Sequence, residues 1–155
     1  MDIEIRRATR ELAPTLTEIA HAAKRHWSYP ERWIQSWREL LTITPAFVAE
    51  HEVFVGVVEE EVVGFYALLD LGTHWSLEHL WVRPQYMRQG VGRRLFAHAV
   101  EQAQSLRPAP LRIESDPNAE RFYLRMGARR IGAIPANMEG VQRSLPVLEL
   151  STAAR

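Results

Sequence analysis

The sequence predicts a single α/β domain, residues 1–155, with a mixed and mostly antiparallel sheet of about seven strands flanked by about four helices. Short segments rich in β-branched and apolar residues are typical of strands, and longer segments repeat apolar residues at helical spacing. A strand, a helix and another strand follow one another between Leu77 and Glu114. This order predicts a pair of parallel strands joined by a right-handed crossover.

The first half of the chain is expected to hold four strands and two helices. The first strand falls at residues 3–5, and helical spacing covers residues 12–23. Ser28 and Glu31 form a capping-box pattern around Pro30, which predicts a second helix over residues 28–41. Segments 53–58, 62–71 and 74–82 are then expected to form successive antiparallel strands.

Four aromatic residues cluster around the second helix, namely Trp27, Tyr29, Trp33 and Trp37. An aromatic-rich core is one explanation of this cluster. The other is that some of these rings line the mouth of a substrate site, and for that role the candidates are Trp27, Tyr29 and Trp33.

The second half continues with a helix over residues 91–103 and a short strand at 111–114. Asp116 and Pro117 are typical of a helix start, and Gly127 of a helix end, so a helix is expected over 116–126. Two final strands are expected at 129–134 and 145–150, separated by a loop over 135–144 that is long enough to be functional.

The composition narrows the class of protein. Lys plus Arg and Asp plus Glu number 19 each, so the overall charge gives no reason to expect a nucleic acid or membrane partner. The chain has no cysteine, which excludes disulfides, thiolate metal sites and a cysteine nucleophile. The first residues are too charged for a signal peptide and no apolar run approaches a membrane span, so a cytoplasmic protein is expected.

The turn before the central helix lacks a capping side chain. Neither Gln89, Gly90 nor Val91 is a Ser, Thr, Asp or Asn, and Arg93 follows in the first helical turn. Cations there oppose the helix dipole. A bound diphosphate would accept the free N–H groups and pair with the arginines. The alternative is an ordinary turn with solvated arginines, because two glycines alone are a weak signal.

Three motifs in order resemble the GNAT superfamily of acyl-CoA-dependent N-acyltransferases. They are the strand end Leu80-x-Val82-x-Pro84, the turn Met87-Arg88-Gln89-Gly90-Val91-Gly92, and the segment from Asp116 to Ala128 with Asn118, Phe122 and Tyr123. Met87 departs from the Gln or Arg that the family usually has at the first turn position. The resemblance implies a single GNAT-like domain whose central parallel strands splay apart.

The resemblance also implies where acetyl-CoA, the co-substrate, would bind. The backbone of the turn would hold its diphosphate, with Met87, Arg88, Gln89, Gly90, Val91, Gly92 and Arg93 as the candidates. Leu80, Trp81 and Val82 would lie along the pantetheine arm. Asn118 would hydrogen-bond that arm, Phe122 would lie beside it, and Tyr123 would sit near the sulfur.

Acyl transfer to an amine requires a base, because a free alkylammonium has a pKa of roughly 10.4. Glu78 is the candidate base, directly or through water, and a cross-strand ion pair is its alternative role. His79 is a candidate for a proton relay and for contact with the acceptor. Tyr123 is the general-acid candidate from the resemblance, with a core tyrosine as the alternative. His74 and His79 fall on opposite faces of a strand, so no metal is expected.

The expected function is N-acetyl transfer from acetyl-CoA to a primary amine of a small molecule or peptide, in a monomer or a homodimer. A non-catalytic acyl-CoA-binding module is the alternative. A dinucleotide-binding domain fits less well, because Gly90 and Gly92 lack a third glycine and no long βα series surrounds them.

Overall fold

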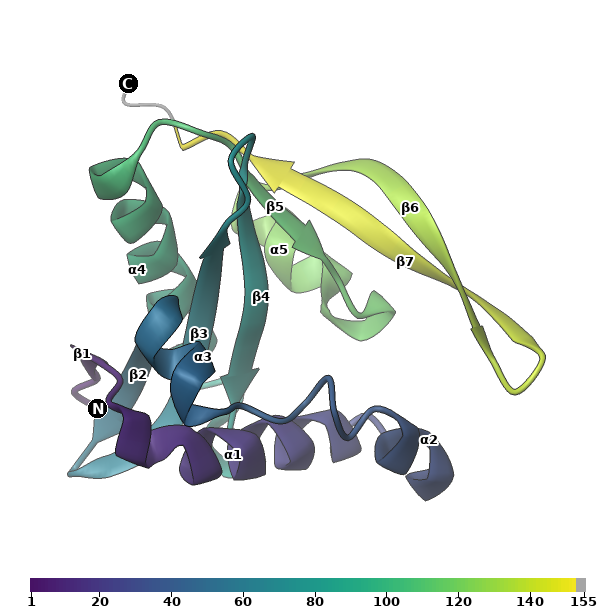
Figure 1. Ribbon diagram of the computed structural model, residues 1–155, viewed down its shortest axis with the longest axis horizontal. Coiled ribbons are helices and arrows are strands. Elements are labelled where there is room, and N and C mark those ends of the chain that lie inside the picture. The colour runs from purple at the N-terminus through teal and green to yellow at the C-terminus, as the bar shows by residue number, and fades with distance from the viewer. Residues whose placement is uncertain (153–155) are drawn as a thin grey trace. The chain divides into compact units, whose positions relative to one another are not determined.

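The computed structural model describes residues 1–152 and contains a seven-stranded sheet in the order β1-β2-β3-β4-β5-β7-β6 (Figure 1). The strands are β1 (Glu4–Arg7), β2 (Glu52–Val58), β3 (Glu61–Asp70), β4 (Trp75–Val82), β5 (Leu111–Glu114), β6 (Arg129–Met138) and β7 (Val141–Leu150). The α-helices of the described range are α1 (Ala13–Arg25), α2 (Glu31–Ser36), α3 (Pro45–Glu50), α4 (Val91–Leu106) and α5 (Glu120–Arg125). Three short 3-10 helices are η1 (Arg10–Leu12), η2 (Pro84–Tyr86) and η3 (Pro117–Ala119).

The sheet is mixed, as the sequence predicts. β4 and β5 run parallel, whereas β1–β2, β2–β3, β5–β7 and β6–β7 are antiparallel pairs. By compactness the chain divides into two units. Unit 1 holds Met1–Leu68 and His79–Ala99, and unit 2 holds Leu69–Glu78 and the residues from Val100 onward.

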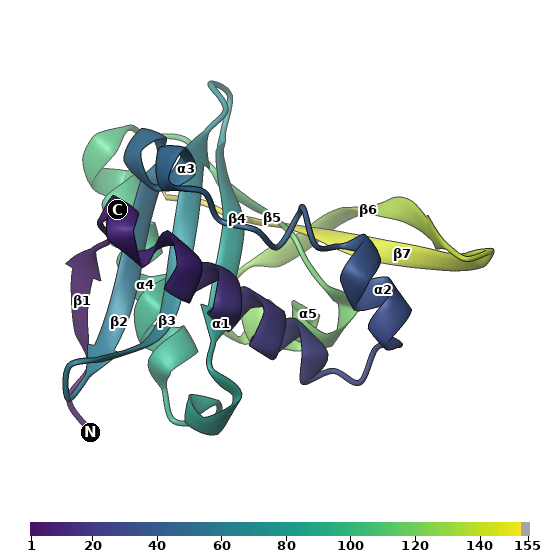
Figure 2. The ribbon, with the colours of Figure 1, turned by 60° about the horizontal axis from the view of Figure 1, so that its bottom comes forward.

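In unit 1, the side chains along β2 and most of β3 are buried on both faces, and α1 and α3 lie over one of these faces (Figure 2). One face packs against α1 and α3 in a cluster that includes Leu16, Val48, Val55 and Phe65. The other face carries Gly64, where an added Cβ would lie 2.8 Å from the carbonyl oxygen of Trp81 and 3.1 Å from Leu95 Cδ1 of α4. Strand β3 therefore needs glycine at this position for β4 and α4 to approach so closely.

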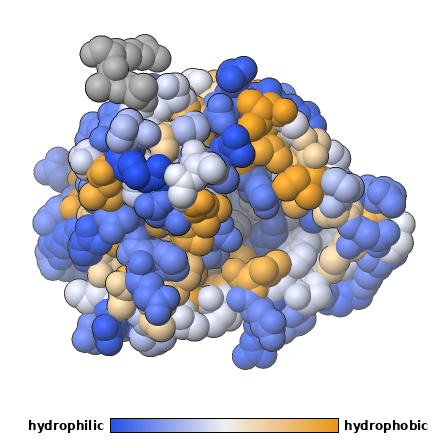
Figure 3. All heavy atoms as spheres, turned by 45° about the horizontal axis from the view of Figure 1, so that its top comes forward, coloured by the Kyte–Doolittle hydropathy of each residue, from blue (hydrophilic) through white to orange (hydrophobic). Residues whose placement is uncertain are grey.

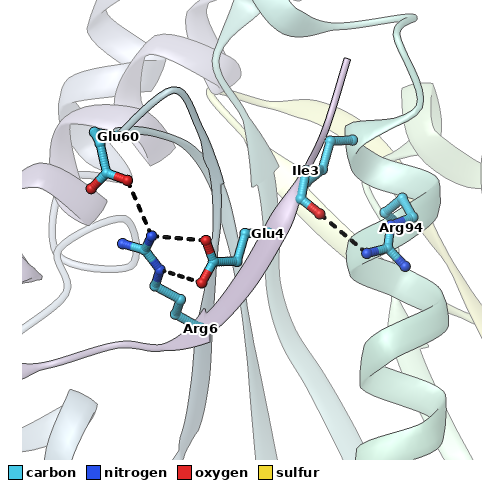
Figure 4. A network of polar contacts seen from close by, with 5 residues as sticks. All are labelled: Ile3, Glu4, Arg6, Glu60 and Arg94. Carbon is cyan, nitrogen blue, oxygen red and sulfur yellow. Dashed lines mark hydrogen bonds and ion pairs between the residues drawn. The ribbon is translucent and has the colours of Figure 1, made fainter.

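The turn between β2 and β3 has an unusual sequence for its shape. Val58 pairs with Glu61, so only Glu59 and Glu60 lie between the strands, and both have left-handed φ values of 48° and 65°. These values belong to a type I′ turn, which favours Asn-Gly. The Glu60 side chain forms an ion pair with the Arg6 guanidinium of β1 (Figure 4), at an N–O distance of 3.3 Å.

In unit 2, the pairing between β4 and β5 is short. It consists of Trp75 with Leu111 and Ser76 with Arg112, and Trp75 N also donates to the Pro110 carbonyl at 2.8 Å. β5 itself stays paired with β7 as far as Glu114. The parallel strands therefore separate after their first two pairs, which confirms the predicted splay.

The prediction of a loop over residues 135–144 is wrong. β6 and β7 are ten-residue strands of one long hairpin, closed by Glu139 and Gly140 (Figure 1). Pro135 pairs with Ser144 inside the hairpin. A proline is tolerated there because β6 is the edge strand of the sheet, where a missing N–H breaks no ladder on the open side.

The helical region before β2 also differs from expectation. The expected helix over 28–41 ends at Ser36, and α2 begins at Glu31 without a side-chain cap from Ser28. A further helix, α3, starts at Pro45, where Thr44 Oγ1 accepts a hydrogen bond from Phe47 N at 3.1 Å. Thr44-Pro45 is a recognisable helix start, so the sequence does carry the signal for α3.

Surface features agree with the balanced composition. On the face drawn in Figure 3, hydrophobic side chains form several separate patches between hydrophilic ones. Among the described residues, no helix has the length and apolar character needed to cross a membrane.

Candidate active site

The turn that leads into α4 forms the best-defined part of the site. Arg88 and Gly90 both have left-handed φ values, 62° and 89°, and α4 begins at the next residue, Val91. Within the described chain, the backbone N–H groups from Arg88 to Arg93 have no protein acceptor, and the first amide that does is Arg94 N, bonded to the Gly90 carbonyl at 3.1 Å. We call residues 88–93 the cradle. Its free amides can bind an anion, as helix N-termini and nests of amides do.

Arginines add positive charge to the cradle. Arg88 and Arg93 are exposed, and neither makes an ion pair with another described residue. Arg94 differs, because its guanidinium donates to the Ile3 carbonyl at 3.2 Å (Figure 4). Two guanidinium groups are therefore available for a bound phosphate.

The segment before the cradle is held by two side chains that the sequence analysis did not single out, Tyr86 and Arg83, and by Gln89 of the cradle itself. Tyr86 donates its hydroxyl proton to Glu61 Oε1 of β3 at 2.8 Å. Arg83 Nε donates to the Val62 carbonyl at 2.8 Å, and Gln89 Nε2 donates to the Gln85 carbonyl at 3.0 Å. These bonds fix the cradle in place before any ligand arrives. Only the tertiary structure reveals the bonds of Tyr86 and Arg83, because Glu61 and Val62 lie more than twenty residues earlier in the sequence.

The second half of β4 brings His79 to Val82 into unit 1. Leu80, Trp81 and Val82 are half-buried, and Trp81 Nε1 donates to His79 Nδ1 at 2.9 Å. His79 is buried beside the rings of Phe47 and Phe65. Burial lowers the pKa of His79 to about 4. The imidazole is therefore neutral at neutral pH, with Nδ1 already engaged as an acceptor, which argues against His79 as the proton relay.

Glu78 stands in unit 2, just beyond the last β4–β5 pair. Its side chain is exposed, and Leu80 and Val82, which follow it at alternate positions along β4, are half-buried. Ser76 donates its hydroxyl proton to Glu78 Oε2 at 3.2 Å. Among the described residues this exposed carboxylate has no partner beyond Ser76, so a substrate amine or water can reach it.

The other residues from the third motif also lie in unit 2. Asp116 caps η3 by accepting from Asn118 N at 2.9 Å and from Asn118 Nδ2 at 3.0 Å, so the amide of Asn118 is held in one orientation. Phe122 is half-buried and packs edge-on against Tyr123. Tyr123 is buried, and burial together with the Asp116 carboxylate raises the pKa of its phenol. Its hydroxyl therefore stays protonated at neutral pH and can act as a donor.

The aromatic cluster of unit 1 is a packed group with partial exposure. Tyr29 and Trp33 stack with centroids 6.0 Å apart, and Trp37 meets both edge-on at 5.1 and 6.0 Å. Trp27 lies outside this group, 38% exposed and edge-on to His26. The structure thus joins Trp37 to Tyr29 and Trp33, and separates Trp27 from them.

The predicted site residues fall into two groups. Unit 1 contains the cradle, Met87, residues 79–82 and the aromatic cluster. Unit 2 contains Glu78, Asn118, Phe122 and Tyr123. Among the described residues, no group of three or more His, Cys, Asp or Glu side chains could hold a metal ion.

The strand, anion cradle and helix of unit 1, with the splayed parallel strands of unit 2, define an acyltransferase fold. The family model described as the acetyltransferase (GNAT) domain matches residues 21–142. The match covers most of the chain, so the chain belongs to the GNAT acetyltransferase family. The predicted family, and with it the predicted class of acyl-CoA-dependent N-acyltransferases, is confirmed.

Solved structures support the same fold. A GCN5-related N-acetyltransferase of Rhodopseudomonas palustris has a TM-score of 0.80 at 18% identity, covering 97% of this chain and 96% of that one. The PaiA N-acetyltransferase of Thermoplasma acidophilum, solved with coenzyme A, has a TM-score of 0.72 at 20% identity, covering 97% and 99%. YncA of Salmonella typhimurium, solved with acetyl-CoA, has a TM-score of 0.70 at 19% identity, covering 100% and 96%. The expected co-substrate agrees with both bound molecules. No curated protein matches the chain.

Proposed function

We propose that this protein transfers the acetyl group of acetyl-CoA to a primary amine of a small molecule or peptide, by direct attack of the amine on the thioester. The observation that carries the proposal is the cradle, where the amides of Arg88 to Arg93 have no protein acceptor in the described chain and Arg88 and Arg93 have no ion-pair partner there. A diphosphate satisfies both needs at once. An added Cβ at Gly90 would meet no atom within 4 Å, so the turn is open at this point.

The chain's residues have separate duties in the proposed reaction. The cradle binds the diphosphate, and the backbone of Leu80 and Val82 bonds to the pantetheine arm; the amide of Asn118 is a further candidate for a hydrogen bond with that arm. When bound, acetyl-CoA supplies the activated acyl carbon. A backbone N–H near Leu80 is proposed to stabilise the oxyanion that develops there.

Proton transfer is assigned to two residues. Glu78, directly or through water, takes a proton from the acceptor ammonium so that the neutral nitrogen can form the new C–N bond. The C–S bond breaks, Tyr123 gives its proton to the departing sulfur, and the second proton that the nitrogen loses returns to the Tyr123 phenolate, directly or through water. The Tyr123 phenol is protonated at neutral pH, as this role requires, and its raised pKa makes it a weaker acid than a free tyrosine. The exposure of Glu78 supports a base in contact with solvent.

The test separates binding from chemistry. Acetyl-CoA at about a thousandfold excess over its dissociation constant should stabilise the protein by roughly 4 kcal/mol. Glu78→Gln should keep this stabilisation and lose thiol release with an amine acceptor. Glu101→Gln, an exposed carboxylate of α4, is the matched control and should keep both.

The outcomes distinguish the candidates. No stabilisation by acetyl-CoA contradicts the cradle and with it the whole proposal. Stabilisation without turnover on any amine favours a non-catalytic acyl-CoA-binding module. Undiminished turnover in Glu78→Gln removes Glu78 from the mechanism, and Tyr123→Phe gives the same decision for Tyr123.

A further inference from the structure

Lys24 is the only lysine in the chain, and the other 18 of the 19 basic residues are arginines. It lies in the last turn of α1 and is half-buried. A chain that otherwise uses arginine has therefore placed its one compact ammonium group at this position. An ammonium differs from a guanidinium in being a point charge rather than a flat group that stacks on rings.

The ammonium of Lys24 sits against aromatic faces. Its Nζ lies 4.4 Å from the centroid of the Trp37 ring and 5.0 Å from that of the Tyr29 ring. Both distances are within the range of cation–π attraction, about 6 Å. The two rings are nearly perpendicular, at 87°, so they form a corner around the charge.

A third ring extends this corner. Trp33 lies nearly parallel to Tyr29, at an interplanar angle of 27°, and meets Trp37 at 70°. We call Tyr29, Trp33 and Trp37 the aromatic box. Rings in this arrangement are how proteins recognise alkylammonium and quaternary ammonium groups. Two of its rings, those of Tyr29 and Trp37, already hold the Lys24 ammonium.

The basic residue that follows Lys24 in the sequence is engaged outside the box. The adjacent Arg25 is drawn away, since its guanidinium forms an ion pair with Glu31 at 2.9 Å. All three rings of the box keep partial contact with solvent. The Lys24 side chain is long and flexible, so it can move out into water without unfolding α1.

We propose that the aromatic box is a binding site for the alkylammonium group of the acceptor. The Lys24 ammonium occupies this site in the free protein, and the acceptor displaces it. The assignment to the acceptor rests on the proposed function, whereas binding of the cation itself does not. The exchange replaces one ammonium by another, so weakly hydrated, methylated ammonium groups should compete best.

The test uses tetramethylammonium chloride as the probe, followed by the indole signals of assigned NMR spectra and by tryptophan fluorescence. Lys24→Met removes the charge and keeps an unbranched side chain. It should bind the probe roughly tenfold more tightly than the unmodified protein, because the competing ammonium is gone. Sodium chloride at equal ionic strength and the neutral tert-butanol are the controls, and neither should shift the Trp33 and Trp37 signals.

A second variant shows whether the rings are the site. Lys24→Met combined with Trp37→Leu should lose binding of the probe, and Lys24→Met with Tyr29→Leu serves if the first does not fold. Equal binding by the unmodified protein and Lys24→Met, or equal shifts with tert-butanol, would overturn the proposal. The acetyl-CoA stabilisation is measured on the same samples. If it is present while the probe does not bind, only this inference fails; if the probe binds and acetyl-CoA has no effect, only the proposed function fails.

Discussion

Arg83 Nη1 lies 2.8 Å from Glu18 Oε1, and this ion pair joins the residue before η2 to helix α1. The Arg83 side chain is only 15% exposed, and its Nε and backbone N bond to the carbonyls of Val62 and Val63, both at 2.8 Å. Three elements of unit 1, namely α1, β3 and the end of β4, therefore meet at one guanidinium. Arg83 is thus a positioning residue for the cradle.

Arg83→Lys should weaken coenzyme A binding roughly tenfold, which corresponds to about 1.4 kcal/mol. A lysine cannot contact the Val62 carbonyl and Glu18 at the same time, as a guanidinium does, so the segment that leads into the cradle is held less firmly. Calorimetry with coenzyme A and with pantetheine, which lacks the diphosphate, is the measurement. Only coenzyme A should bind less well. Arg112→Lys, which alters an exposed ion pair with Glu149 in unit 2, is the control, and equal losses for both ligands would contradict the assignment.

Two glycines of unit 1 offer a matched pair for testing how closely the strands are packed. Gly64→Ala should destabilise the protein by about 1–3 kcal/mol, because the new Cβ would lie 2.8 Å from the Trp81 carbonyl oxygen. Gly56→Ala places its Cβ at 3.5 Å from Leu95 Cδ2, an ordinary contact, and should change stability by less than about 1 kcal/mol. Urea denaturation of both variants is the measurement. Similar losses for the two would show that the approach of β3 to β4 is looser than described.

Stability should depend on pH through His79. Its pKa falls from 6.5 to about 4 in the folded protein, so between these values the unfolded chain binds more protons and acid favours unfolding. The contribution is fully present above pH 6.5 and is lost as the pH falls towards 4, with a total of roughly 3 kcal/mol. Denaturation at pH 7.5 and pH 5 measures it.

His79→Gln is the comparison for this pH dependence. Between the same two pH values it should lose roughly 2 kcal/mol less than the unmodified protein, because the titrating group is absent. His74→Gln, a half-buried histidine of unit 2, is the control and should follow the unmodified protein. Parallel pH profiles for all three would contradict a buried, neutral His79.

The sequence predicts the elements whose signals are local. Pro84 ends a strand, Gly90 turns the chain and apolar spacing continues the helix, so β4, the turn and α4 follow from short-range rules. The β6–β7 hairpin was harder, because Pro135 and Gly140 suggest a loop. The proline is acceptable only at a sheet edge, and edge position is a property of the whole sheet.

The candidate site also has features that the sequence predicts and features that only the folded chain shows. The free amides of the cradle can be anticipated from the absence of a capping side chain near Gln89, and the structure agrees. The roles of Arg83, Tyr86 and Lys24 could not be anticipated, because each depends on partners brought together by folding. For Glu78 the alternation of a strand indicates a face, but it cannot say whether that face is covered, and here the side chain is exposed.

The turn formed by Glu59 and Glu60 is a place where the thermal stability of the protein can be raised without changing any proposed catalytic residue. Left-handed φ costs a residue with a side chain roughly 1 kcal/mol relative to glycine, and the turn has two such residues in succession. Replacing them together by Asn-Gly should raise the melting temperature by about 2–4 °C per kcal/mol recovered, less the small contribution of the Arg6 contact. An engineer who wants a sturdier enzyme can therefore begin at this turn, and calorimetry of the double variant, with acetyl-CoA stabilisation unchanged, would show whether the gain is real.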